Sequence, residues 1–190
     1  MARRRGIRHV LAFDDAPFPR SHRGDVKVVG TLFSGPRLDG VLWTKVRRDG
    51  TNSTRALIEA TRRSRFYPQV QAVLLQGITL AGFNVVDLDR LHLALERPVL
   101  VVARKAPDLD AIRSALHTRV PGGARKWRLI EAAGPMEPAG RVWVQRRGIE
   151  LETVRQVLKR FCLYSDVPEP LRVAHIIAGS LSPLGSRRRV

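Results

Sequence analysis

The chain has 190 residues, 44% of them hydrophobic, and a formal net charge of +17 from 34 basic and 17 acidic residues. This length allows one domain with a substantial core, and the apolar content excludes a disordered chain. No apolar run approaches the roughly 20 residues of a membrane-spanning helix. The single cysteine, Cys162, excludes an internal disulfide and a cysteine-based zinc site.

The three strands predicted first lie at 7–13, 26–33 and 38–46, and their close spacing favours antiparallel pairing. A helix with Asn52 or Ser53 as its cap follows, up to about residue 65. The next predicted elements are a buried strand at 70–75, a helix over 83–95 that Gly82 opens, and an apolar strand at 98–103.

In the second half, Pro107-Asp108 begins a helix that runs to about residue 117. A glycine-rich loop at 120–124, short strands at 126–131 and 141–145, and helices at 151–163 and 168–180 complete the pattern. Alternating strands and helices require parallel pairing with right-handed crossovers. The pattern predicts an α/β fold, a single domain with a mixed β-sheet flanked by helices. We expect this domain to span 6–187, between basic tails at 1–5 and 188–190.

The N-terminal Met-Ala-Arg-Arg-Arg-Gly has the charge of a signal peptide but no apolar region or cleavage site, so we expect a cytoplasmic protein without a membrane partner. Cys162 is expected to be a packed, reduced thiol. Arginine far outnumbers lysine, and its planar fork suits phosphate contact. The charge favours a nucleic-acid partner through counterion release; codon bias or a hot habitat is the alternative explanation.

Polar residues stand where the predicted strands end, and ligands bind at the carboxyl ends of strands in open α/β sheets. These residues are Asp14 and Asp15 after the first strand, Gln76 and Gly77 after the fourth, and Arg104 and Lys105 after the fifth. Adjacent strand residues point to opposite faces, so only one of the two aspartates can face a shared site unless the strand has already ended. A turn-forming pair before Ala-Pro is the alternative explanation of the aspartates.

Four segments carry a resemblance: Leu-Ala-Phe-Asp-Asp at 11–15, the segment 76–87, Val-Val-Ala-Arg-Lys at 101–105, and Val-Pro-Glu-Pro-Leu-Arg-Val-Ala-His at 167–175. Their order and spacing resemble endonuclease V. The chain more closely resembles, over about 6–187, an uncharacterised, mainly archaeal protein family related to endonuclease V. Phe-Asp-Asp-Ala-Pro-Phe at 13–18 and Arg-Lys-Ala-Pro-Asp-Leu at 104–109 belong to this match. The resemblance implies a ribonuclease H-like fold and brings no settled activity.

The resemblance also implies a metal site. The first-strand carboxylate of endonuclease V corresponds to Asp14 or Asp15, the second acid loosely to Asp49, and a metal-site residue of the last helix to His175. If the chain is catalytic, the resemblance implies Mg²⁺ or Mn²⁺, because phosphodiester hydrolysis uses oxygen ligands that hold such an ion. A hydrogen-bonded core histidine is the alternative for His175.

The chain departs from endonuclease V at Gln76, which stands where that family has an aspartate before glycine. An amide oxygen can bind a metal ion but contributes no charge, so the site is expected to be weakened. Asp87 is a candidate replacement, and an acid that stabilises a helix start is its alternative role.

Three further candidates also have structural alternatives. Arg172 either contacts substrate or pairs with Glu169 three residues earlier. Asn84 either presents its amide to a ligand or caps a helix. The Arg104-Lys105 pair either contacts phosphate or belongs to a solvated loop.

We therefore expect a nucleic-acid-binding protein on an endonuclease V-like scaffold with a modified or lost metal site. The alternatives are an active Mg²⁺- or Mn²⁺-dependent endonuclease of DNA or RNA, and a non-catalytic module that binds a ligand or a protein. Convergence of the acids and His175 at the carboxyl edge favours the nuclease, whereas evenly spread basic charge favours the module. The catalytic candidates are Asp14, Asp15, Asp49 and Asp87; the metal candidates are Asp14, Asp15, Asp87 and His175; the nucleic-acid or phosphate candidates are Gln76, Gly77, Asn84, Arg104, Lys105 and Arg172.

Overall fold

The structure, a computed structural model, describes residues 6–182 and contains a seven-stranded mixed sheet in the order β3-β2-β1-β4-β7-β9-β8. Its strands are β1 (His9–Asp15), β2 (Asp25–Ser34), β3 (Arg37–Arg47), β4 (Ala72–Gln76), β7 (Val99–Ala103), β8 (Glu137–Ala139) and β9 (Val142–Arg147). A separate ribbon pairs β5 (Thr79–Leu80) with β6 (Asn84–Val85). The predicted tails at 1–5 and 188–190 lie outside the described residues.

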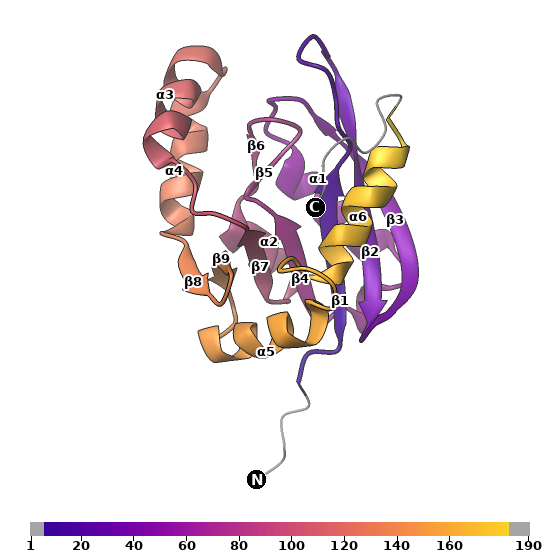
Figure 1. Ribbon diagram of the computed structural model, residues 1–190. Coiled ribbons are helices and arrows are strands. Elements are labelled where there is room, and N and C mark those ends of the chain that lie inside the picture. The colour runs from indigo at the N-terminus through magenta and orange to yellow at the C-terminus, as the bar shows by residue number, and fades with distance from the viewer. Residues whose placement is uncertain (1–5, 183–190) are drawn as a thin grey trace.

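The helices are α1 (Ser53–Arg63), α2 (Leu88–Leu95), α3 (Leu109–Arg119), α4 (Gly123–Ala133), α5 (Leu151–Phe161) and α6 (Glu169–Ser180), with one 3₁₀ turn, η1 (Tyr67–Gln69). Figure 1 shows α5 and α6 on one side of the sheet and α1 and α2 on the other, with α3 and α4 beside the β9–β8 edge. None of the helices within residues 6–182 has both the length and the apolar character needed to cross a membrane.

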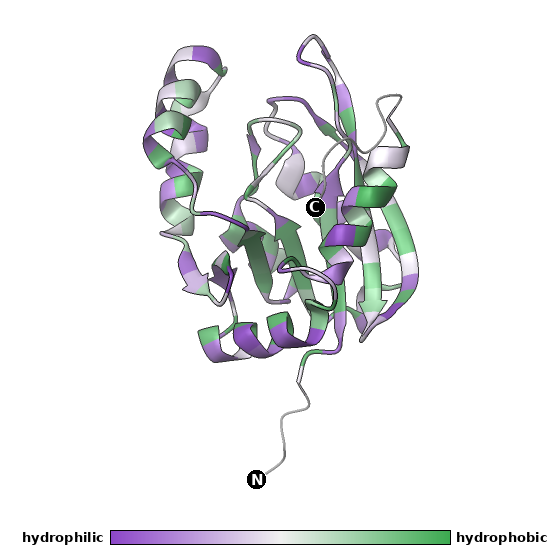
Figure 2. Ribbon diagram, viewed as in Figure 1, coloured by the Kyte–Doolittle hydropathy of each residue, from purple (hydrophilic) through white to green (hydrophobic). Residues whose placement is uncertain are grey.

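The sheet is mixed, as the sequence predicted. The pairs β1–β4 and β4–β7 are parallel, and the remaining neighbours are antiparallel. Strand β1 is buried on both faces, because Leu11 and Phe13 belong to one core cluster whereas Val10 and Ala12 belong to another. The hydrophobic centre of the sheet stands out in Figure 2. The polar residues at the ends of β1 and β4 therefore adjoin these two core clusters.

The predicted strand at 126–131 is wrong, since these residues lie in α4. Its buried residues are Gly123, Lys126, Ile130 and Ala133, and their spacing of three to four is helical. The predicted glycine-rich loop at 120–124 therefore ends early, with Gly122 as the cap of α4. A six-residue window was too short to distinguish this pattern from alternation.

The predicted start of the helix at 83–95 is also wrong. Helix α2 begins at Leu88, and Asn84–Val85 form strand β6 instead. The helix start is set by Asp87, whose side chain accepts a hydrogen bond from the Arg90 amide. Gly82 lies in the β5–β6 turn, with a φ of +83°, and does not begin a helix.

Candidate functional site

A buried acid–imidazole pair joins the end of β1 to the middle of α6. Asp14 is 5% exposed, and its Oδ2 lies 2.8 Å from His175 Nδ1. Thr31 holds α6 in place, because its hydroxyl donates to the Pro170 carbonyl at 2.8 Å. Burial raises the pKa of Asp14, and the hydrogen bond and charge of His175 oppose that rise. The pair is therefore a titratable unit held between two rigid elements.

Gln76 ends β4 beside this pair. Phe13 lies opposite Leu75 in the parallel register, so Asp14 and Gln76 follow as neighbours on the same face. The Oε1 atom of Gln76 is buried and has no hydrogen-bond partner within residues 6–182. Buried polar atoms are almost always satisfied in folded proteins. This oxygen is therefore positioned for a group that residues 6–182 do not supply.

Asp15 points to the other face of β1. Its Oδ2 accepts a hydrogen bond from the Ala81 amide at 3.0 Å. Burial, and after it the charge of Asp14, raises the pKa of Asp15 to about 7. The two aspartates thus serve opposite sides of the sheet, and only Asp14 faces His175.

Asp49 lies in the turn after β3 and holds the turn that follows β5. Its Oδ1 accepts from the Phe83 amide at 2.8 Å, and its own amide donates to the Ala81 carbonyl at 2.9 Å. A Cβ on Gly82 would lie 2.5 Å from the same Oδ1, so this approach requires glycine. The ammonium of Lys126 donates to the Asp49 carbonyl. The geometry of Asp49 is that of a loop anchor.

Asn84 is fully buried in β6, and all its hydrogen bonds stay within the protein. Its Oδ1 accepts from the Ser53 amide at 3.0 Å, at the start of α1. Its Nδ2 donates to the Arg47 carbonyl and to Asn52 Oδ1, both at 2.9 Å. Asn84 therefore caps a helix, but that helix is α1 rather than the one that follows it.

The remaining candidates are spread over the carboxyl edge and beyond it. Asp87 caps α2, away from the Asp14–His175 pair, through the Arg90 amide. Arg172 donates to both carboxylate oxygens of Glu169, at 2.7 and 2.6 Å. This is the pairing with Glu169 that was the alternative to a contact with substrate. Lys105 is exposed.

Two cavities flank the strand ends. Arg104 lines one of about 540 Å³ together with Arg141, Tyr164, Ser165 and Asp166. The other, of about 570 Å³, is mainly apolar and begins at Gly77, directly after Gln76. Its walls include Ile78, Phe83, Pro107, Ile112, Met136 and Gln145. The glycine-lined loop 77–84, where the sequence suggests that a non-catalytic module would bind its ligand, forms one wall of this cavity; the apolar residues around it were not predicted.

The donor set for Mg²⁺ or Mn²⁺ is small. Within residues 6–182, no group of three or more His, Cys, Asp and Glu side chains is placed to hold a metal ion. Asp14 and the unpartnered oxygen of Gln76 remain as two oxygen ligands. Mg²⁺ is commonly held by one or two protein oxygens together with substrate phosphates and water. The residues therefore fit an ion that substrate helps to bind, rather than an ion held by the protein alone.

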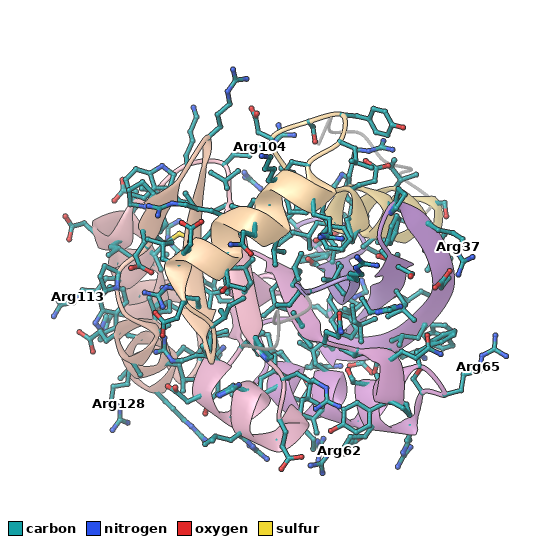
Figure 3. All side chains as sticks on the ribbon, turned by 90° about the horizontal axis from the view of Figure 1, so that it is seen from below. Arg37, Arg62, Arg65, Arg104, Arg113 and Arg128 are labelled. Carbon is teal, nitrogen blue, oxygen red and sulfur yellow. The ribbon has the colours of Figure 1, made fainter. Side chains whose placement is uncertain are left out.

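The six arginines labelled in Figure 3 are not gathered at the strand ends. In Figure 3 the labelled arginines point outward on several sides of the molecule, with Arg104 near the loop after α5 and Arg37, Arg113 and Arg128 far from it. These six arginines therefore do not locate a nucleic-acid site, and their spread agrees with the distribution expected for the non-catalytic module.

A family model described as endonuclease dU matches residues 6–182. The chain belongs to the endonuclease dU family. UPF0215 proteins are similar to this family member: one from Deinococcus radiodurans is 52% identical over 176 residues, covering 93% of this chain and 90% of that protein. Another, from Methanothermobacter thermautotrophicus, is 42% identical over 183 residues, covering 94% and 89%. The predicted membership of a mainly archaeal family is confirmed.

Solved structures confirm the predicted fold of this endonuclease dU family member. A protein of unknown function from Archaeoglobus fulgidus has a TM-score of 0.86 and 31% identity, covering 92% of this chain and 98% of that one. Human endonuclease V has a TM-score of 0.60 and 16% identity, covering 92% and 84%. Ciona intestinalis endonuclease V, in complex with inosine-containing DNA, has a TM-score of 0.57 and 15% identity, covering 92% and 85%. At these identities the two endonuclease V structures show a shared fold.

Proposed function

We propose that this protein is an endonuclease that binds DNA containing deoxyuridine and cleaves the strand near that nucleotide. The observation that carries the proposal is the buried Asp14–His175 pair beside the unpartnered Gln76 oxygen, at the carboxyl ends of β1 and β4. The family description, endonuclease dU, supplies the substrate class. The fold shared with a DNA-bound endonuclease V supports nucleic acid as the partner.

Each group of the site has a distinct task in this proposal. Asp14 and Gln76 would hold Mg²⁺ or Mn²⁺, which when bound neutralises phosphate charge and activates water. His175 donates to Asp14 and favours its ionised form, opposing the effect of burial. Arg104 and Arg141, which share the polar cavity, would contact phosphates of the same strand.

The apolar cavity provides room for the target base. Enzymes that act at a single base commonly extrude it from the stack into a pocket. The cavity lies on the face of the sheet where Val101 packs with Phe13, opposite to Asp14, and reaches the carboxyl edge at Gly77, one residue after Gln76; its volume of about 570 Å³ exceeds that of a pyrimidine. Gly77 and Gly82 present backbone without side chains there, so a base could approach the main-chain amides closely.

Cleavage of short duplex and single-stranded oligonucleotides tests the proposal. Each carries one deoxyuridine, one deoxyinosine or only normal bases, and is incubated with the protein and Mg²⁺ or Mn²⁺. We expect cutting only of the deoxyuridine strand, lost in Asp14→Asn while gel-shift binding remains. Absence of DNA binding at low salt, or absence of cutting across metals and substrates, contradicts the proposal.

A second candidate function is DNA binding without cleavage. It is favoured by Gln76, which replaces an expected carboxylate, and by the absence of a three-ligand acidic cluster within residues 6–182. The same assay separates the two functions, because this candidate requires a gel shift with no product in either metal.

A further inference from the structure

We propose that the exposed face of the β2–β3 ribbon binds a single-stranded DNA segment that flanks the reaction site. In this proposal a base stacks on Trp43 and a phosphate lies between Lys27 and Lys45. The inference rests on the proposed function, because it identifies where the same substrate continues beyond Asp14. We call these three residues the β2–β3 platform.

The sheet register aligns the platform with the candidate site. Asp14 pairs with Val29, and Val29 pairs with Trp43, so the three residues form one row across β1, β2 and β3. Residues in one row share a face, and two strand spacings separate Asp14 from Trp43 by about 10 Å. Thr31, two residues from Val29, bonds to α6, so this is the face that α6 partly covers. Trp43 therefore lies beyond α6, on the outer edge of the same face.

Lys27 and Lys45 lie directly opposite each other two positions further toward the carboxyl edge, on the same face as Trp43. Like charges at such positions repel and destabilise a strand pair. Both lysines are exposed, and neither has an ion-pair partner among the side chains of residues 6–182. Two positions further again, by contrast, Arg47 lies opposite Asp25 and pairs with it at 3.9 Å. The uncompensated lysine pair is thus a local excess of charge that an anionic group would relieve.

Trp43 supplies the second element of the platform. Trp43 is 60% exposed, and Val41, two positions away on the same face, is 44% exposed. The opposite face of β3 is covered, because Leu42 packs on the core and a Cβ on Gly40 would meet the Phe66 ring. An exposed tryptophan next to paired lysines combines a stacking surface with a phosphate contact, which is how proteins hold single strands. A single strand fits better than a duplex, because stacking on Trp43 requires an unstacked base.

Fluorescence anisotropy with a labelled single-stranded oligothymidylate, titrated at several salt concentrations, tests the platform. We expect Trp43→Ala to weaken binding roughly tenfold, because stacking on one aromatic ring is worth about 1–3 kcal/mol. The double variant Lys27→Gln/Lys45→Gln should also reduce the slope of log affinity against log salt by about 0.7, the value for one phosphate contact with a single strand. Quenching of tryptophan fluorescence by the oligonucleotide should fall in Trp43→Ala.

The matched control is Lys159→Gln/Arg160→Gln, which removes two exposed charges from α5. Equal losses in the two double variants would show that only net charge matters and would overturn the platform. Unchanged binding in Trp43→Ala and in the lysine variant, with cleavage of deoxyuridine DNA intact, would overturn the platform and leave the proposed function standing. A protein that binds no DNA at low salt would overturn both. Far-ultraviolet circular dichroism and thermal unfolding confirm that each variant is folded.

Discussion

His175 Nδ1 lies 2.8 Å from Asp14 Oδ2, although 161 positions separate the two residues in the chain. The contact joins the last helix to the central strand and places an imidazole on a buried carboxylate. Since the hydrogen bond favours ionised Asp14, its removal should raise the pKa of that carboxyl.

Replacing the imidazole should therefore change the pH dependence of cleavage. In His175→Ala, the acidic limb of the pH–rate profile should move to higher pH by about one unit, because Asp14 ionises later. The measurement is single-turnover cleavage of deoxyuridine DNA between pH 5 and 9, with the exposed neighbour change Ile176→Ala as control. A uniform loss of rate at every pH would mean that His175 does not act through the ionisation of Asp14.

The raised pKa of Asp15 predicts a pH-dependent stability. The folded state holds its proton up to about pH 7, whereas the unfolded chain releases it near 3.8. This contribution is therefore fully present below pH 3.8 and is lost as pH rises through about 7. Asp15→Asn keeps an acceptor for the Ala81 amide and should be more stable than the parent at pH 8, by on the order of 3 kcal/mol.

Urea unfolding at pH 5 and pH 8 measures this difference for the parent and for Asp15→Asn. The exposed Glu59→Gln serves as control and should leave the pH dependence as it is in the parent. The same pH slope in Asp15→Asn as in the parent would mean that the Asp15 carboxyl ionises normally in the fold. Asp15→Asn should still retain part of the pH dependence of stability, because the pKa of Asp14 is also raised.

Restoring an acid at the end of β4 tests the role of Gln76. Gln76→Glu adds a carboxylate where a buried amide oxygen lacks a partner within residues 6–182. Mn²⁺ affinity, measured by isothermal titration calorimetry without DNA, should rise at least about tenfold, because the ion gains an anionic ligand. The exposed change Gln69→Glu is the control, and an equal affinity in the two variants would place the metal elsewhere.

Asp87 can be compared with a second aspartate in the same structural role. Asp87 caps α2 and Asp108 caps α3, each by accepting one backbone amide. Asp87→Ala and Asp108→Ala should each lower the free energy of unfolding by about 1 kcal/mol. Both should retain cleavage at 25 °C. Selective loss of cleavage in Asp87→Ala would instead support the catalytic role expected from the sequence.

The contact between Gly82 and Asp49 should make that glycine intolerant of a side chain. Gly82→Ala combines a φ of +83° with a 2.5 Å approach to Asp49 Oδ1, and should cost about 3 kcal/mol in unfolding free energy. Gly140→Ala has a similar φ of +70° with no atom nearby, and should cost about 1 kcal/mol. Equal costs in denaturant unfolding would mean that the loop yields to the added methyl group.

Local patterns predicted much of the fold because they depend on short segments. The apolar runs of β1 and β4 identified both strands and the polar residues at their ends. The same reasoning failed at α4, where the buried Lys126 reads as polar in sequence but reaches the Asp49 carbonyl in the fold. A buried charge with a distant partner has no local signature.

The sequence predicted the site as a group of candidate residues. The tertiary structure separates those with structural roles from those that meet at the site. Asp49 and Asn84 are bonded to loops and helix starts, as is Asp87 at the cap of α2, whereas Asp14 meets His175. Pairing of β2 with β3 likewise places Lys27 opposite Lys45, near the exposed Trp43. This arrangement depends on the register between the two strands, which the sequence of either strand alone does not specify.

The sequence by itself determined the alternating sheet and helices, the positive charge, and an aspartate pair and an amide at adjoining strand ends. Only the tertiary structure decided that Asp14 faces α6 whereas Asp15 faces the β5–β6 ribbon. The physical reason is that side-chain direction within a strand is local, but the hydrogen-bond partner of a buried polar group comes from whichever distant segment covers that face. For Gln76 Oε1 no part of residues 6–182 supplies that partner, and this is why the end of β4 is where we expect the substrate.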